Sequence, residues 1–136
     1  MASFMLHEAT TLPDDGFAGA LAGRVWLGDV DGPSVVAVRQ DGVFDITASF
    51  PTMHDLCEHE APAAALRAAA GPRVSSLAEI LARTPREARA PGLPRLLAPV
   101  DLQAIKAAGV TFAQSLLERV IEERARGSRE GAAKAR

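Results

Sequence analysis

Apolar residues in the first third of the chain come in short runs that are separated by turn-forming residues. The runs Arg24–Val30 and Ser34–Arg39 are rich in β-branched residues, and an Asp-Gly-Pro sequence between them is typical of a turn. An Asp-Gly pair then precedes a third run, Val43–Thr47, and this pair is common in tight hairpins. The pattern predicts a three-stranded antiparallel meander, and we expect Trp26 to lie in its core.

Three helical signals follow this region. Thr52 has the hydroxyl group of a helix N-cap and precedes a short amphipathic stretch. The stretch Ala61–Ala70 consists of good helix formers and stops at a Gly-Pro pair. Ser76 and Glu79 have the spacing of a capping box, in which each side chain accepts a hydrogen bond from the other residue's backbone amide, so we expect a short helix to begin there.

Prolines dominate the next segment. Residues 84–99 contain four prolines, which interrupt helices and central strands, and we interpret this segment as an extended Pro-rich linker and a domain boundary. Beyond it, residues 104–110 are consistent with a short buried strand. Apolar side chains then recur at helical spacing and predict an amphipathic helix whose apolar face consists of Phe112, Leu116, Leu117, Val120 and Ile121.

The predicted fold class is therefore α+β. A small N-terminal domain, residues 1–83, contains the antiparallel β-meander with short helices, and the Pro-rich linker occupies 84–99. Residues 100–127 are expected to form a strand–helix unit. The polar tail, 128–136, is expected to be disordered or to be a truncated helix.

Composition narrows the function classes. The 136 residues are 48% hydrophobic, too apolar for a wholly disordered chain, and a net charge of −2 gives no support to broad electrostatic binding of nucleic acid or anionic membranes. With Cys57 as the single cysteine, the chain forms no intrachain disulfide and no four-cysteine zinc site. It shows neither a signal-peptide pattern nor an apolar run of about 20 residues, so we expect a cytoplasmic protein.

One cluster contains metal-ligating residue types. His54, Cys57 and His59 lie in one short stretch, together with Glu58 and Glu60. Imidazole and thiolate are zinc ligands and a Glu-x-Glu pair can hold a divalent ion, but the spacing places the two histidines on different sides of a helix. The alternatives are an amphipathic turn with the cysteine buried and a solvated helix end. Glycine-rich nucleotide motifs, a P-loop and a Gly-x-Ser-x-Gly elbow are absent from the sequence, so those enzyme classes have no support.

A second candidate site lies at the start of the C-terminal helix. Gly109 ends the expected strand, and the turn after it leaves backbone amides free to bind a carboxylate or an oxyanion. Ser115 and Glu118 follow at positions i and i+3, which places a hydroxyl group beside a carboxylate that can hold water or accept a proton. The alternative is a polar pair that serves only as helix cap and surface.

The same segment carries a family resemblance. Residues 98–127, and above all the sequence Gly-Val-Thr-Phe-Ala-Gln-Ser-Leu-Leu-Glu at 109–118, resemble the start of the catalytic domain in the fumarylacetoacetate hydrolase family. The stretches Gly42–Thr47 and Pro51–Leu56 are similar to the small N-terminal domain of that family. The resemblance implies that residues 100–127 begin a truncated β-rich catalytic domain. It also implies a hydrolase or lyase that acts on 2-oxo or 2,4-dioxo carboxylic acids.

The motif departs from the usual family pattern at its centre. The common signature is Gly-x-Asn-Tyr-x-x-His-x-x-Glu, and here Ser115 stands at the position of the catalytic histidine, while Glu118 matches the glutamate. This version looks like a branch that includes dehydratases of sugar-derived 2-keto-3-deoxy acids, in which a carboxylate handles the proton alone. The resemblance therefore implies catalytic roles for Glu118 and Ser115, and it implies substrate-binding roles for Gly109, Val110 and Thr111.

Members of this family bind Mg²⁺ or Mn²⁺ through a Glu-x-Glu pair and an Asp downstream of the motif. No such residues follow Gly127, so we expect no metal site and no cofactor in this chain alone. We interpret the chain as the N-terminal portion of a longer homodimeric enzyme with a keto acid substrate, inactive by itself. Two alternatives are a non-catalytic module that self-associates or binds a partner through 112–121, and a small metal-binding protein that uses His54, Cys57 and His59.

Overall fold

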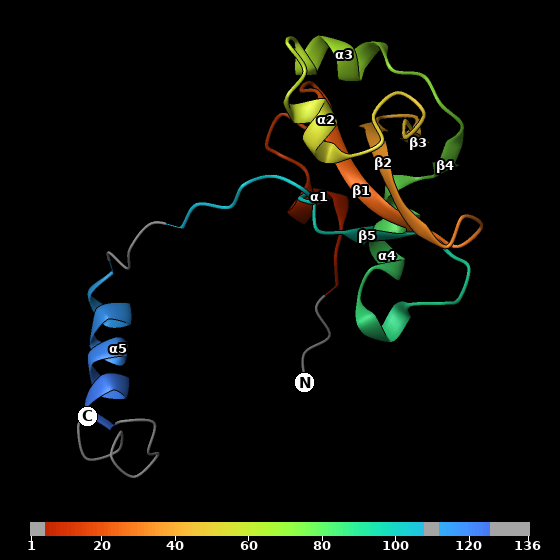
Figure 1. The fold of residues 1–136 in the computed structure, drawn as a ribbon. Helices are drawn as coiled ribbons and strands as arrows, with labels where there is room; N and C mark the ends of the chain where they lie inside the picture. Colours follow the sequence, from red (N-terminus) through yellow and green to blue (C-terminus); the bar gives the residue numbers. More distant parts are fainter. Residues whose placement is uncertain (1–4, 108–111, 126–136) are drawn as a thin grey trace. The chain divides into compact units, whose positions relative to one another are not determined.

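The computed structural model describes residues 5–107 and 112–125 (Figure 1). The chain divides into two compact units, Met1–Gln103 and Ala104–Arg136, and each is described by itself. The first unit is α+β, as predicted from the sequence, and contains a five-stranded antiparallel sheet with several short helices. The elements in chain order are α1 (Glu8–Thr11), β1 (Leu21–Leu27), β2 (Gly32–Arg39), β3 (Gly42–Asp45), α2 (Met53–Cys57), α3 (Pro62–Ala68), β4 (Arg73–Ser75), α4 (Leu77–Arg83), the 3₁₀ helix η1 (Arg86–Ala88), β5 (Arg95–Leu97) and α5 (Ala113–Ala125).

The sheet has the strand order β4-β3-β2-β1-β5, and every neighbouring pair is antiparallel. The expected meander forms its centre, because β1, β2 and β3 are consecutive in the sequence and adjacent in the sheet. In the hairpin between β2 and β3, Arg39 lies opposite Gly42. Gly42 has a φ of +146°, and a side chain there would meet Arg73 Nε at 2.6 Å, so this position requires glycine.

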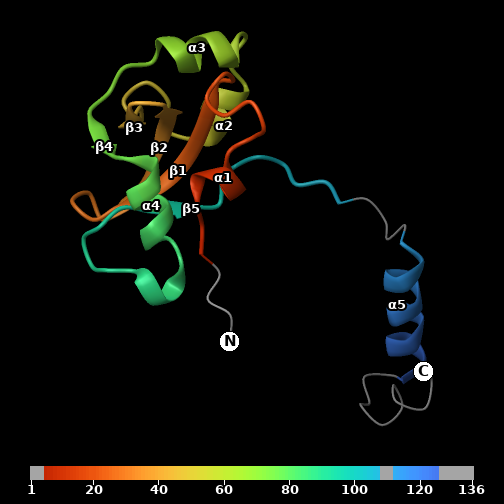
Figure 2. The ribbon, with the colours of Figure 1, turned by 180° about the vertical axis from the view of Figure 1, so that it is seen from behind.

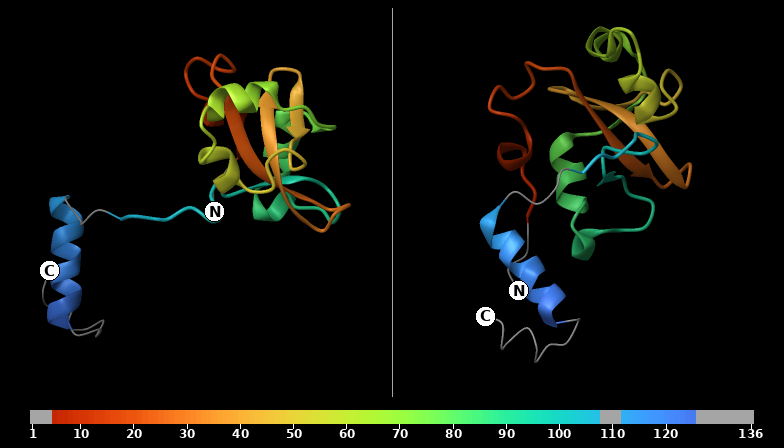
Figure 3. Two further views of the ribbon diagram at one scale, coloured as in Figure 1. Left: turned by 45° about the horizontal axis from the view of Figure 1, so that its top comes forward. Right: turned by 60° about the vertical axis from the view of Figure 1, so that its left-hand side comes forward.

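Helices cover both faces of the sheet. The central strand β2 carries the uninterrupted apolar run Val35–Val38, which is typical of a strand buried on both sides. The right-hand view of Figure 3 shows α2 and α3 on one side of the sheet and α4 on the other, and α4 is also clear in Figure 2. The core beneath α4 contains Val25, Leu27, Val36, Val43, Leu77, Ile80 and Leu81, and the core beneath α2 and α3 contains Val35, Ala37, Ile46, Met53, Leu56, Leu66 and Ala69.

The helices α2 and α4 begin where the sequence predicts. Thr52 caps α2, with its hydroxyl oxygen accepting from the Asp55 amide at 3.0 Å and the Asp55 carboxylate accepting from the Thr52 amide at 3.1 Å. Ser76 and Glu79 make the same reciprocal pair at the start of α4. These capping boxes orient α2 and α4, so that their apolar residues face the sheet.

The segment 84–99 is not a linker, which corrects the expected domain boundary. Within it, β5 pairs with β1 as an edge strand, and the Leu96 amide donates to Thr84 Oγ1 at 2.9 Å. The prolines of this segment flank β5 and do not interrupt it, and an edge strand needs hydrogen bonds along one side only. The first compact unit therefore extends to Gln103.

Trp26 also departs from expectation, because it does not belong to either buried core cluster. Side chains alternate along β1, and Val25 and Leu27 occupy the positions that face α4. Trp26 lies on the opposite face, half-buried, with the Arg95 guanidinium carbon 5.1 Å from its ring centroid. The large aromatic ring therefore packs with an arginine at the β1–β5 edge.

The second unit contains the predicted amphipathic helix, α5, which has 13 residues. The strand expected at 104–110 is not formed by residues 104–107, which are exposed and outside any helix or strand, and residues 108–110 lie outside the described part of the chain. The tail at 128–136 also lies outside it. Among the described residues, no helix combines the length and the apolar character needed to span a bilayer.

Candidate functional site

The motif at 109–118 is described only in part. Gly109, Val110 and Thr111 lie outside the described residues. Ser115 and Glu118 both belong to α5, so their i, i+3 spacing falls on one continuous helix, and Glu118 is exposed. Residues three apart in a helix lie on the same side, so α5 is the element that brings these two positions together.

The apolar face of α5 is largely exposed to solvent. The exposed fractions are 77% for Phe112, 55% for Leu116, 62% for Leu117 and 38% for Val120. Ile121 is half-buried. A helix of this length gains most of its stability from burial of such a face, so the exposed side chains mark α5 as an element that requires a covering surface.

The residues around α2 have structural roles. Met53 and Leu56 are buried in the core, whereas Cys57 is exposed, so the interpretation with a buried cysteine is wrong. His59 Nδ1 accepts a hydrogen bond from the Ala61 amide at 3.1 Å. The His54 Nδ1 atom is buried and has no hydrogen-bond partner among the described residues. The two imidazoles thus occupy different environments.

The described part of the chain contains no recognisable metal-binding site. No group of three or more His, Cys, Asp or Glu side chains there is arranged to hold a metal ion. The Mg²⁺ or Mn²⁺ implied by the family resemblance needs several oxygen ligands around one cation. The described residues do not fit that requirement, and we derive no catalytic step through a metal.

Residues 98–103, which we call the strap, follow β5 and are held against the domain by Arg24 and Asp101. Arg24 Nη1 donates to the carbonyl oxygens of Ala98, at 3.2 Å, and Val100, at 2.7 Å. Its Nε lies 3.6 Å from a carboxylate oxygen of Asp101, and the two side chains are only 17% and 11% exposed. An arginine with its fork of donors thus binds the strap at three points.

The carboxylate of Asp101 also binds the first turn of α2. It accepts hydrogen bonds from the amides of Met53, at 2.7 Å, and His54, at 3.1 Å, and from the amide of Leu102 at 2.7 Å. Burial by itself raises the pKa of Asp101, but these three amides and Arg24 outweigh burial and hold the pKa below its ordinary value of 3.8. Asp101 is therefore ionised at neutral pH and acts as an acceptor for α2.

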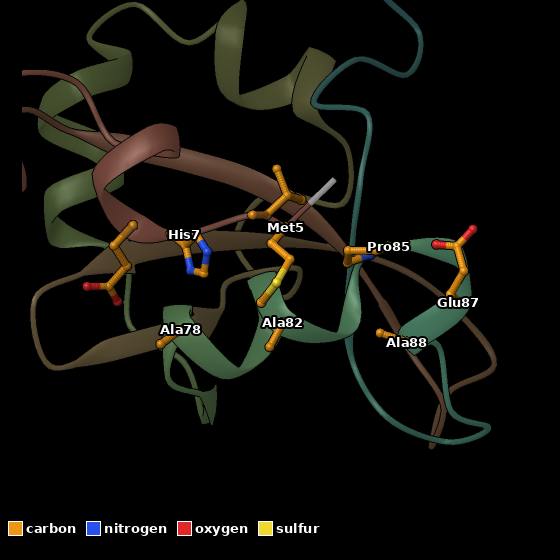
Figure 4. Close-up of a pocket in the computed structure, with 9 residues that line it drawn as sticks. Met5, His7, Ala78, Ala82, Pro85, Glu87 and Ala88 are labelled. Atoms are coloured by element: carbon orange, nitrogen blue, oxygen red, sulfur yellow. The ribbon is translucent and has the colours of Figure 1, made fainter. Parts of the chain in front are cut away.

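A cavity of about 460 Å³ lies between the N-terminal segment and α4 (Figure 4). Its wall is mainly apolar, and Figure 4 shows Ala78 and Ala82 on successive turns of α4, close to Met5 and His7. Glu8 and Glu87 add two carboxylates to the lining. This composition suits an apolar group better than a charged keto acid.

Comparison with protein-family models, with curated proteins and with solved structures gives no match to this chain. The family resemblance therefore rests on the residues of the 98–127 segment and of the two earlier stretches.

The contacts of Arg24 and Asp101 could not be found from the sequence. Asp101 lies 47 and 48 positions from the two α2 amides that it binds. A capping side chain is recognised in a sequence when it lies within three positions of the helix start, as Thr52 does. A cap supplied from another part of the chain has no local pattern.

Proposed function

We propose that this chain is the N-terminal portion of a fumarylacetoacetate-hydrolase-like enzyme. The complete enzyme acts on 2-oxo or 2,4-dioxo carboxylic acids, as a hydrolase or a dehydratase, with a divalent metal held by residues outside this chain. The observation that supports the proposal is a compact α+β domain followed by a helix that carries Ser115 and Glu118 and leaves its apolar face exposed. A catalytic sheet would cover that face.

In this proposal the residues of the 109–118 motif have different chemical roles. The backbone amides after Gly109 and the hydroxyl group of Thr111 hold a carboxylate or an oxyanion of the substrate. Glu118 takes up and returns the proton as acid and base, and Ser115 orients water or the substrate. The spacing of Ser115 and Glu118 within α5 supports this division, because it keeps both on one side of the helix.

The chain alone is proposed to be inactive, since its described residues include no group of side chains arranged to hold a metal ion and α5 would form only one wall of an active site. The complete enzyme is proposed to be a cytoplasmic homodimer. The length of the polypeptide is checked first, by intact mass of the protein from its native source. A mass close to three times that of this chain is expected, whereas the mass of this chain alone contradicts the proposal.

Turnover of keto acids is the test of the assigned residues. In the native polypeptide with Mg²⁺, Glu118→Gln is expected to lower turnover of 2-keto-3-deoxy sugar acids or acylpyruvates by about a hundredfold or more, because the variant loses its proton-transfer group. Circular dichroism should be unchanged, because Glu118 is exposed.

Glu123→Gln is the matched control, since Glu123 is another exposed glutamate of α5. It should retain turnover. Equal losses in the two variants, or full activity of Glu118→Gln, would exclude Glu118 as the acid and base.

A second candidate function is supported by the exposed face of α5: a non-catalytic module that self-associates. Phe112 and Leu117 are the most exposed apolar residues of that face. If two copies bury these faces against each other, sedimentation at micromolar concentration should show a dimer, and Leu117→Asp should convert it to a monomer. A wild-type chain that sediments as a monomer at every concentration contradicts this second function.

A further inference from the structure

The cavity between the N-terminal segment and α4 lies wholly within the first compact unit and has no role in the proposed function. Its volume of about 460 Å³ falls within the range of small-molecule sites in proteins, about 300–1,000 Å³. Three elements contribute to its wall: the segment that leads into α1, the outer side of α4, and η1. The cavity therefore has the size and the enclosure that a small ligand requires.

The side of α4 that faces away from the sheet leaves this space open. The larger apolar side chains of α4 belong to the core beneath the helix, whereas Ala78 and Ala82 line the cavity. Residues four apart in a helix lie on the same side, so both positions present only a methyl group to the cavity. Figure 4 shows the two alanines on successive turns, with Met5 close to Ala82. A longer side chain at either position would occupy part of the space.

The opposite wall is apolar and is anchored to the domain. Leu6 packs against the core cluster beneath α4 and so holds the N-terminal segment in place. Met5 also lines the cavity, and it is 64% exposed. An apolar ligand in the cavity would remove Met5 and the alanine methyl groups from water, which favours binding.

The charged groups of the lining are all acidic. Glu8 comes from α1 and Glu87 from η1, and neither forms an ion pair with another described residue. No lysine or arginine is among the described residues of the lining. Arg83 of α4 lies 4.0 Å from the Glu79 carboxylate, and Arg86 is exposed outside the lining. Carboxylates beside an apolar wall attract cations and repel anions.

We propose that this cavity binds a small amphiphilic cation, a molecule with an apolar body and an ammonium group. The apolar body contacts Met5 and the two alanines of α4, and the ammonium group lies beside the carboxylates of Glu8 and Glu87. The proposal does not rest on the proposed function, because neither a keto acid nor α5 takes part.

The test titrates the full chain with octylammonium, 1-octanol and octanoate, which share an apolar tail and differ in charge. In calorimetry, octylammonium is expected to bind at least about tenfold more tightly than octanoate. Amide shifts in NMR spectra should be largest in α4 and η1. Equal affinities for the cation and the anion would overturn the proposal, and so would a lack of octylammonium binding.

Ala82→Leu tests the position of the site. The added side chain fills the cavity and should weaken octylammonium binding about tenfold or more. The helix should persist, because Ala82 is exposed and leucine is a good helix former. Ala78→Leu, which fills the same space from the preceding turn, is the second variant. The matched control is Ala64→Leu at an exposed position of α3, on the other side of the sheet, which should leave binding unchanged.

The double variant Glu8→Gln, Glu87→Gln tests the role of charge. Octylammonium affinity should fall towards that of 1-octanol, while the affinity for 1-octanol itself should not change, because the apolar wall is kept. Glu60→Gln is the matched control, since Glu60 is an exposed glutamate outside the lining. Full octylammonium affinity in the double variant, or in both cavity-filling variants, would overturn the proposal.

Discussion

The helices α4 and α5 both have amphipathic sequences, but the apolar side chains of α4 are buried and those of α5 are exposed. In α4, Leu77 is 5% exposed, and Ile80 and Leu81 are fully buried against the sheet. In α5, Leu116 and Leu117 remain more than half exposed. Helical periodicity thus predicts that a helix forms and which side is apolar. It does not predict which surface covers that side, and the described residues of the second unit leave the apolar face of α5 uncovered.

The largest expected effect is on the free energy of unfolding, which should fall much more when an apolar side chain is truncated in α4 than in α5. Ile80→Ala removes a fully buried side chain from the core beneath α4 and should lower the free energy of unfolding by about 2–5 kcal/mol. Leu117→Ala removes a side chain that is 62% exposed and should change it by about 0.5 kcal/mol or less. Urea unfolding followed by Trp26 fluorescence measures the first effect, and urea unfolding followed by circular dichroism, to which α5 contributes, measures the second.

This comparison fails if Leu117→Ala costs as much as Ile80→Ala. Such a result would mean that α5 is covered in solution, either by the first unit or by a second copy. Sedimentation of the wild-type chain at the same concentration distinguishes these two arrangements, because only the second increases the molecular mass in solution.

A smaller effect, on the pH dependence of stability, is expected at the N-terminus of α4, where the Glu79 carboxylate accepts hydrogen bonds. The hydroxyl group of Ser75, then the amide and hydroxyl group of Ser76, lower the pKa of Glu79 from 4.5 to about 2. The folded-state pKa is the lower one, so this stabilisation is complete above pH 4.5 and is lost as the pH falls to about 2. The advantage of the wild type over Glu79→Gln should therefore shrink within that interval.

Urea unfolding of the wild type and Glu79→Gln between pH 7 and pH 2 measures this difference. Asp101 also has a lowered pKa, but it is present in both proteins and cancels in the comparison. A difference between the two proteins that stays constant with pH would mean that the Glu79 carboxylate contributes nothing as a charge.

The sequence predicts features that depend on neighbouring residues. The N-cap at Thr52, the capping box at Ser76 and the β1–β3 meander were recognisable because their partners lie close in the chain. The edge strands β4 and β5 were not, because each has three residues and acquires its conformation from a strand far away in the sequence. A proline-rich composition indicates the absence of a central strand but does not exclude an edge strand.

In the candidate site, too, some features were predictable from the sequence and others were not. The i, i+3 relation of Ser115 and Glu118 follows from helical periodicity and was predictable. The role of Asp101 depends on Arg24 and on the start of α2, which only the folded chain brings together. The catalytic roles of Ser115 and Glu118 stay a prediction until turnover is measured.

The strand order has a consequence for how this domain is made during protein synthesis. β1 is translated first, but its outer edge is completed by β5, whose last residue is Leu97. While the nascent chain is shorter than that, the backbone groups of β1 on that edge have no strand beside them, and such an edge can pair with other chains. A ribosome that pauses between β4 and β5 therefore leaves this edge of β1 without a neighbouring strand, and emergence of β5 from the exit tunnel closes the edge.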